Sequence, residues 1–456
     1  MKINISIINF SLSLILLGIF FMPFNSWEGL AFLGEYSRDS CVLFFLTAFL
    51  ILTFKKKIKL PLHSPIFYLL IVFLIWALST FFLNIIDVSS NFFKQTTGYN
   101  RFFRQFISLA LSAFILPITF YNVFLKFEIS ILLVKIRKVM LFSLVVVASY
   151  AFIEILIVKF NFIFLKKSLL NLYDYLPFIE AKIDLNGSRI SSITFESPAL
   201  GTYLITVFSW LASYVLTSKK WYNFIPTLLI IFLAFISGSR AAFFIILIQS
   251  FAFLAIIAGT RKYSKVFLKS LIILTMTSSV GLLISAPKII NYLSTEVQSF
   301  KLNDSDHSIS NKSRFGIQYA IYKVFLENPI LGVGYGQQAF ESRSKYPAWA
   351  KRNNWEFKLK YLNQNDKSFP PGFNLYLRLA AETGIIGVSI FLLFISYILT
   401  WCINNIKPRN NLLGIIILIS MIGFLFNWLK MDTFRIYGFW ICLALIFTIP
   451  KKLMNE

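Results

Sequence analysis

Residues 327–336 read ENPILGVGYG, and they lie at the centre of a polar interval between two strongly apolar parts of the chain. RFG precedes them at residues 314–316, and GFNLYL at 372–377 and AETGIIG at 381–387 follow them. The interval extends over residues 287–373, and no other part of the sequence is as long, as polar and as rich in glycine and proline. We therefore expect the hydrophobic remainder to be a scaffold that presents this long loop.

The composition indicates a membrane protein. Of 456 residues, 57% are hydrophobic and only 14% are charged, and the mean hydropathy is +0.72. Such a chain has too little polar surface to cover a soluble globule. Its 44 Lys and Arg against 20 Asp and Glu are typical of basic residues at the cytoplasmic ends of membrane helices. We predict an all-α polytopic membrane protein that contacts membrane lipids and binds no nucleic acid.

Metal and disulfide chemistry are not indicated by the sequence. Cys41, Cys402 and Cys442 fall far apart in apolar segments, where neither a disulfide framework nor a thiolate metal site is expected. His63 and His307 are the only histidines, which argues against a histidine-rich metal site. We therefore expect no metal and no other cofactor.

A helix needs about 20 apolar residues to cross a bilayer, and this length predicts about twelve spans. The expected spans are residues 4–24, 39–54, 65–85, 105–122, 139–158, 198–216, 223–237, 240–258, 266–285, 375–403, 411–429 and 437–450. The single membrane domain then has spans 1–9 in residues 1–286 and spans 10–12 in residues 374–456. The partly helical loop 287–373 separates the two groups.

Basic clusters follow every second predicted span, and positively charged loops stay on the cytoplasmic side of a membrane. The clusters are Lys55–Lys57 with Lys59, residues 126–138, Lys219–Lys220, Arg261–Lys262 with Lys265, Lys407 with Arg409, and Lys451–Lys452. Both termini are therefore predicted to be cytoplasmic, and the long loop is predicted to lie on the outer face. Residues 121–138 alternate apolar and basic positions, so we expect either a helix on the inner leaflet or a simple connector.

Arginines at the outer ends of spans are candidates for binding an anion. Arg189 opens the polar segment that leads into span six, and Arg240 lies in the short connection between spans seven and eight. Arg240 is interpreted either as an anion clamp or as a side chain that snorkels to lipid headgroups. Arg314 is predicted to open a helix that runs to Leu326, and its alternative role is that of an exposed loop arginine.

The glycines of residues 332–336 predict a flexible turn. Gly332, Gly334 and their neighbour Tyr335 could form a backbone nest for an anion. They do not form a dinucleotide fingerprint, because Gln337 stands where the third glycine would be. Residues 382–384 are predicted to be a turn, either just above span ten or included in the numbered span 375–403.

Together and in this order, these motifs resemble the O-antigen ligase and O-antigen polymerase (Wzy) superfamily. The resemblance covers residues 185–400 and is carried by RISSITFESPALGTYL, SGSRAAFF, SRFGIQYAIYKVFLENPILGVGYGQQAF and FNLYLRLAAETGIIG. It implies a GT-C-like helical glycosyltransferase in the bacterial inner membrane, with an active site that faces the periplasm between the helices and the long loop. The implied substrates are sugar chains on undecaprenyl pyrophosphate, and the implied partners are a flippase and a chain-length regulator.

One difference from the ligases of this superfamily favours the polymerase branch. Ligases typically carry a histidine before the asparagine that enters span ten, whereas Phe373 stands before Asn374 here. A polymerase transfers the growing glycan from undecaprenyl pyrophosphate to the next lipid-linked repeat unit. The alternatives are a ligase that transfers glycan to lipid A core and a flippase, although a flippase is expected to show related halves.

The polymerase reaction needs charge placement and a base. Guanidinium groups match phosphate oxygens bidentately, so Arg240 and Arg314 are predicted to be catalytic without a metal. Glu196 is the predicted base for the acceptor hydroxyl, and its alternative role is to cap a helix. The predicted substrate-binding residues are Arg189, Gly332, Gly334, Tyr335 and Asn374.

Overall fold

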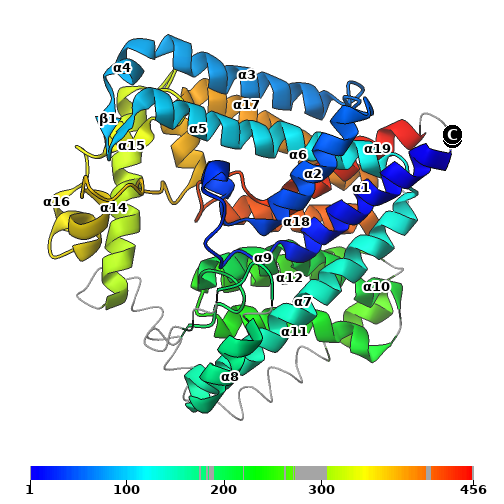
Figure 1. Ribbon diagram of the computed structural model, residues 1–456. Coiled ribbons are helices and arrows are strands. Elements are labelled where there is room, and N and C mark those ends of the chain that lie inside the picture. The colour runs from blue at the N-terminus through cyan, green and yellow to red at the C-terminus, as the bar shows by residue number, and fades with distance from the viewer. Residues whose placement is uncertain are drawn as a thin grey trace.

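The structure is a computed structural model. It describes the chain except residues 1, 174–175, 181–182, 184–188, 219, 261–262, 271, 273–305, 407–411 and 454–456. Helices dominate the described part (Figure 1). The elements of the first half are α1 (Lys2–Phe21), η1 (Ala31–Tyr36), α2 (Ser40–Phe54), α3 (Pro65–Leu83), α4 (Ile85–Ser90), β1 (Phe92–Phe93), β2 (Thr96–Thr97), α5 (Gly98–Ala110), the π-helical η2 (Leu111–Ile115), α6 (Leu116–Phe124), α7 (Ile129–Phe160) and α8 (Phe164–Tyr173).

The second half holds the long loop and the last three apolar helices. Its elements are α9 (Ser197–Ala212), α10 (Tyr214–Thr217), η3 (Trp221–Phe224), α11 (Ile225–Ile236), α12 (Arg240–Ala258), α14 (Asp306–Glu327), α15 (Gln338–Ser342), α16 (Ala348–Lys351), the π-helical η5 (Phe357–Tyr361), α17 (Leu375–Ile406), α18 (Leu412–Asn427) and α19 (Tyr437–Leu453). The strands β1 and β2 form a small antiparallel hairpin.

Six helical stretches in the described residues are long and apolar enough to cross a membrane. They are Pro65–Leu83, Gly98–Phe124, Ile129–Phe160, Ser197–Thr217, Arg240–Ala258 and Leu375–Ile406. Five shorter apolar helices coincide with further predicted spans: Ser6–Phe21, Ser40–Phe54, Trp221–Ile236, Leu412–Asn427 and Tyr437–Ile449. Most of the predicted span 266–285 lies outside the described residues. The all-α membrane class is confirmed, and the number of twelve spans stays a prediction.

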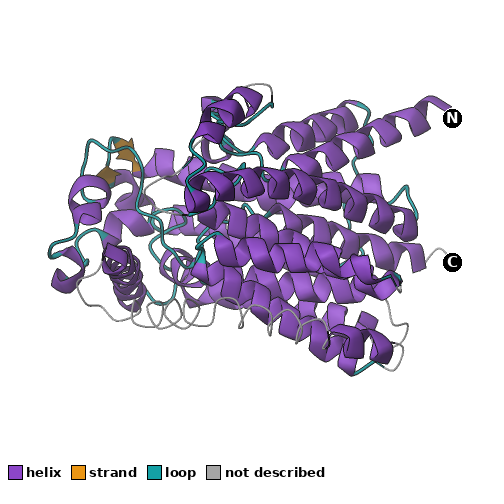
Figure 2. Ribbon diagram, turned by 90° about the horizontal axis from the view of Figure 1, so that it is seen from below, coloured by secondary structure: helices purple, strands orange, loops and turns teal. Residues whose placement is uncertain are grey.

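The two ends of the helical bundle differ in character. The N- and C-termini lie at one end, while α14, α15, α16 and the β1–β2 hairpin lie at the other (Figures 1 and 2). Because consecutive apolar helices run up and down the bundle, the long loop is held at the end opposite both termini. This arrangement agrees with the predicted separation of loop and termini by a membrane, whose sides remain a prediction.

The helix α19 lies at the centre of the bundle. It packs against α6, α9 and α18, and its residues from Phe439 to Phe447 are almost completely buried. A helix that is apolar all round is stable only when other helices cover every face. The outer helices pair around it, with α1 against α2, α3 against α17, and α12 against both α9 and α18.

The described part of the long loop has a hydrophobic core of its own. The buried face of α14, which includes Ile317 and Val324, packs with side chains that follow it in sequence, including Tyr346 and Phe357. A buried lysine anchors this unit to the β1–β2 hairpin, because Lys94 Nζ donates to the carbonyls of Lys360 at 2.6 Å and Asp366 at 3.0 Å. The described part of the loop, residues 306–373, is therefore a folded unit attached to the bundle.

Two local predictions are wrong in detail. Residues 129–138 are not a separate helix on the inner leaflet, because they are the first turns of α7, and only residues 125–128 connect it to α6. Arg314 does not open its helix, because α14 begins at Asp306 and places Arg314 in its third turn.

The predicted turn at residues 382–384 is confirmed as a break inside α17. Gly384 has φ 64° and ψ −172°, a conformation that side chains disfavour. A Cβ atom there would lie 2.0 Å from the carbonyl oxygen of Ile330. The break therefore depends on glycine and lets the residue 327–336 segment approach α17 closely.

Candidate functional site

Three charged side chains from separate parts of the chain interact electrostatically at the loop end of the bundle. Glu196 is the N-cap residue of α9, Arg314 lies on α14, and Lys430 follows the end of α18. The Glu196 carboxylate interacts electrostatically with Arg314, Lys430, Arg189 and Lys360. We call Glu196, Arg314 and Lys430 the charged triad. Two of its members are predicted site residues, and the third is not.

A buried acid, Glu154, holds the segment that carries Glu196. Glu154 of α7 is inaccessible to solvent and accepts hydrogen bonds from the backbone N–H groups of Ser191, at 3.2 Å, and Ser192, at 2.7 Å. Thr194 closes the turn by donating its hydroxyl to the carbonyls of Ser191 and Glu196. Because these bonds fix the backbone before α9, they orient the Glu196 side chain.

The helix-capping alternative for Glu196 is not supported by its contacts. Glu196 occupies the N-cap position of α9, but its side chain makes no capping hydrogen bond. The carboxylate keeps an exposed surface, yet partial burial raises its pKa above the usual value, against the opposing effects of Arg314, Lys360, Lys430 and Arg189. A carboxylate with a raised pKa is a stronger base than an ordinary glutamate.

Arg189 and Arg240 lie beside this segment. Gly238 has φ +69°, and a Cβ atom there would lie 3.2 Å from Arg189 Cγ, so Arg189 extends across the turn that precedes α12. Arg240 is the first residue of α12 and is half-buried. The two helices touch at this point, since a Cβ atom at Gly201 of α9 would lie 2.4 Å from Ala242 Cβ. Both arginines are thus at the end of the bundle that carries Glu196.

Arg314 projects from the exposed side of α14 toward the residue that enters α17. Its guanidinium carbon lies 5.4 Å from the centre of the Phe373 ring, a cation–π distance. Gln318, one helical turn further on, donates to the Phe373 carbonyl at 3.2 Å. Phe373 itself has φ +54°. Phe373, which stands where ligases carry a histidine, therefore contacts the Arg314 guanidinium in this protein.

Lys430 is the site residue that sequence reasoning missed. Its side-chain nitrogen is buried and has no hydrogen-bond partner among the described residues. Burial, together with the nearby Arg314, lowers its pKa to about 8, although Glu196 acts in the opposite direction. The available signal was the charged sequence KMDTFR at residues 430–435 between two apolar helices.

A buried ion-pair network supports the site from the side of α17. Arg378 Nε lies 3.1 Å from both oxygens of Glu382, and its other nitrogens donate to the Asp432 carbonyl at 2.7 Å and to Gln105 Oε1 at 2.8 Å. Gln105 in turn donates to Glu35 at 2.9 Å. The i, i+4 spacing of Arg378 and Glu382 was visible in the sequence, but their distant partners were not.

Backbone N–H groups of the predicted anion nest are hydrogen-bonded to neighbouring segments of the protein. The backbone N–H groups of Val333 and Gly334 donate to the carbonyls of Ala381, at 2.9 Å, and Glu382, at 3.0 Å. That of Tyr335 donates to Thr80 Oγ1 at 3.1 Å. A Cβ atom at Gly332 would lie 2.5 Å from the backbone of Glu382. These contacts favour a structural role for Gly332, Gly334 and the buried Tyr335.

Asn374 also has a structural contact. Its side-chain oxygen accepts the backbone N–H of Leu377 at 3.1 Å, as an N-cap residue does at the start of a helix. The cap fixes the first turn of α17 directly after Phe373.

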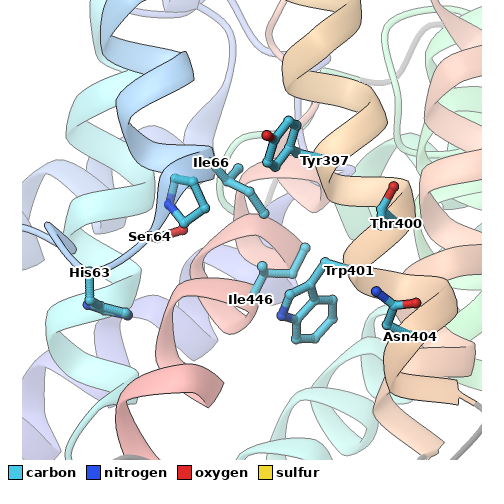
Figure 3. A pocket seen from close by; sticks show the side chains of 9 residues that line it. His63, Ser64, Ile66, Tyr397, Thr400, Trp401, Asn404 and Ile446 are labelled. Atoms are coloured by element: carbon cyan, nitrogen blue, oxygen red, sulfur yellow. The ribbon is translucent and has the colours of Figure 1, made fainter.

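A pocket of about 460 Å³ lies elsewhere, between the start of α3, the C-terminal half of α17 and α19 (Figure 3). It is lined by His63, Ser64, Pro65, Ile66, Tyr397, Thr400, Trp401, Asn404 and Ile446. These parts of the three helices belong to the end of the bundle with the chain termini. The pocket is thus remote from the charged triad and is not part of the candidate site.

The charged triad and its arginines can bind an anion and move a proton. Guanidinium and ammonium groups bind phosphate oxygens, and a carboxylate beside them can accept a proton from a hydroxyl. Within the described residues, no group of three or more His, Cys, Asp and Glu side chains could hold a metal ion.

The fold and the site define a helical membrane protein with a charged centre at one end of the bundle. Residues 225–392 match the family model described as O-antigen ligase, and this match supports the resemblance to the O-antigen ligase and polymerase superfamily over that part of the chain. The matched region contains Arg240, Arg314 and Asn374, and it does not distinguish polymerase from ligase. None of the curated proteins matches the chain.

Proposed function

We propose that the protein is a polysaccharide polymerase of the bacterial inner membrane, which transfers a growing glycan from undecaprenyl pyrophosphate to the next lipid-linked repeat unit. The observation that carries this proposal is the electrostatic interaction of the Glu196 carboxylate with Arg314, because the reaction needs a base beside a phosphate-binding cation. The GT-C-like architecture and the periplasmic orientation of the loop are part of the proposal.

The proposed reaction is a substitution at the anomeric carbon of the donor sugar. The acceptor hydroxyl oxygen forms a bond to this carbon while its proton passes to Glu196. The bond from the carbon to the phosphate oxygen breaks, and its electron pair stays on the pyrophosphate. Arg314 and Arg240 stabilise the negative charge that develops there. Each preorganised donor of this kind lowers the activation barrier by about 3–4 kcal/mol.

The cations of the site take the place that a divalent metal holds in many phosphate-binding enzymes. We accordingly propose that turnover does not depend on a metal. Addition of a chelator to the purified protein should leave transfer unchanged, and a loss that returns on addition of Mg²⁺ would contradict this part of the proposal.

The polymerase branch is favoured over the ligase by the position of Phe373. A ligase is expected to place an imidazole before the asparagine that enters α17, and this protein places there a ring that contacts Arg314. The distinction can be tested by deleting the gene and separating the lipopolysaccharide or capsule of the strain on gels. We expect a single repeat unit attached to core, and unattached long chains would identify a ligase.

A further inference from the structure

The connection between α18 and α19, residues 430–436, is held rigidly. Asp432 Oδ2 accepts the backbone N–H of Gly372 at 2.6 Å, and the Asp432 carbonyl accepts Arg378. At the other end of the connection, Arg435 lies 3.5 Å from Asp39 and over the ring of Tyr36. Short connections with contacts of this kind hold their side chains in one orientation.

The first residues of this connection lie against α9. The sulfur of Met431 accepts the hydroxyl of Thr202 on α9 at 3.3 Å. Lys430 precedes Met431 and interacts electrostatically with Arg314 and with Glu196, which occupies the N-cap position of the same helix. Lys430 therefore belongs to the same charged centre, although more than 100 residues separate it from Arg314 in the sequence.

The ammonium group of Lys430 has no hydrogen-bond acceptor among the described residues. Buried ammonium groups in proteins are normally hydrogen-bonded, because an unpaired buried donor costs free energy. The Lys430 nitrogen is buried without such a bond among the described residues, and the neighbouring Arg314 repels it. Glu196 is the one acid of the charged triad, and the cations that interact with it are Arg314, Lys360, Lys430 and Arg189. A bound anion would supply the missing charge and the missing acceptors.

We propose that Lys430 is a third phosphate-binding cation of this site, which donates to the pyrophosphate of the lipid carrier and neutralises its charge as the glycan leaves. This inference rests on the proposed function, and it adds a residue from outside the region that matches the family model. Lysine suits the role because its ammonium group is a compact point charge with three donors.

The titration of Lys430 gives the inference a pH signature. Its pKa is lowered to about 8 by burial and by Arg314 on α14, against Glu196 before α9. The protonated form binds phosphate, so affinity is present below this pH and is lost as the pH rises through it. A bound anion favours the charged form and therefore shifts the loss to higher pH.

The experiment uses the full-length protein in lipid nanodiscs and undecaprenyl pyrophosphate as the probe. We expect Lys430→Met to weaken binding about 10- to 100-fold, which is the range for losing a charged hydrogen bond. Lys430→Arg keeps the charge at all accessible pH values, so it should retain binding and move the alkaline loss well above pH 8. The control is Lys351→Met, which removes an exposed lysine of α16 from the same loop unit and should change nothing.

A second measurement needs no variant. In the wild-type protein, acylation of Lys430 by an amine-selective reagent, followed by mass spectrometry, should rise around pH 8 and be suppressed by the lipid probe. Binding that is unchanged in Lys430→Met, or acylation that the bound lipid does not suppress, would overturn the inference while leaving the proposed function intact. Wild-type protein that does not bind the lipid would instead refute the proposed function.

Discussion

The substitution Arg314→Lys tests the site most directly. Lysine keeps the positive charge but loses the planar fork that can contact two phosphate oxygens at once. If Arg314 stabilises the leaving pyrophosphate, the loss of a well-placed donor should lower kcat about 10²- to 10³-fold. If Arg314 only contacts the Phe373 ring, the loss is that of an exposed cation–π interaction, about 0.5–1 kcal/mol, or about a 2- to 5-fold effect.

The chain offers a matched control for this substitution. Arg343 is also exposed, and its guanidinium carbon lies 5.2 Å from the Phe93 ring, close to the 5.4 Å between Arg314 and Phe373. Arg343→Lys therefore removes a similar ring contact, together with a hydrogen bond to the Phe92 carbonyl. The charges that shift the pKa of Glu196 are Arg314, Lys360, Lys430 and Arg189, and those that shift the pKa of Lys430 are Arg314 and Glu196. Arg343 belongs to neither set.

The assay is extension of lipid-linked repeat units by purified protein, followed as turnover and as chain-length distribution at matched protein amounts. We expect Arg343→Lys to retain most of the activity and Arg314→Lys to lose nearly all of it. Equal activities of the two variants would refute the assignment of Arg314 to the reaction and leave it a structural residue.

Four further outcomes are expected. Arg240→Lys should also lower turnover. The double variant with Arg314→Lys should lose less transition-state stabilisation than the sum of the two single losses, because the effects of residues that bind one group are non-additive. Strict additivity would show that the two arginines do not bind the same group. Turnover should fall as the pH drops through the raised pKa of Glu196, since the base must be ionised, and Glu196→Gln should abolish turnover; a fully active Gln variant would exclude this base. Phe373→His should not restore glycan transfer to core in a ligase-null strain, because a base also needs an orienting partner; restoration would show that one residue separates the two activities. A cysteine at Ser310 should react with a membrane-impermeant reagent from the outer face, and labelling from the cytoplasm alone would invert the proposed orientation.

The apolar helices were predictable because a bilayer imposes a length on every spanning helix. Hydrophobic runs placed the ends of α2, α3, α12 and α19 within a few residues of those observed. The prediction for span four was less accurate at its start, because α5 begins at Gly98 with an amphipathic, arginine-containing segment that hydropathy alone does not reveal. Residues 129–138 were misassigned for the same reason, since their basic residues obscured the start of α7.

The candidate site was predictable only where single residues carry the signal. Arginines and an acid at the ends of apolar helices are conspicuous, so Arg240, Arg314, Arg189 and Glu196 could be named as candidates, and their roles stay predictions. The glycine turn of residues 332–336 was also found, but its partners were not. Its backbone donors pair with α17 about 50 residues later in the sequence, and this pairing changes its interpretation from an anion nest to a packing element.

The sequence by itself determined the helical membrane class, the long polar loop and the resemblance to the O-antigen ligase superfamily, because hydrophobic length and local motifs are properties of contiguous residues. Only the tertiary structure decided which charges meet. Lys430 joins Glu196 and Arg314 because α9, α14 and the α18–α19 connection converge at one end of the bundle. Arg378 similarly pairs with Glu382 nearby and with Gln105 across 273 positions. Electrostatic interactions depend on distance in space and on burial, and neither can be read from separation along the chain.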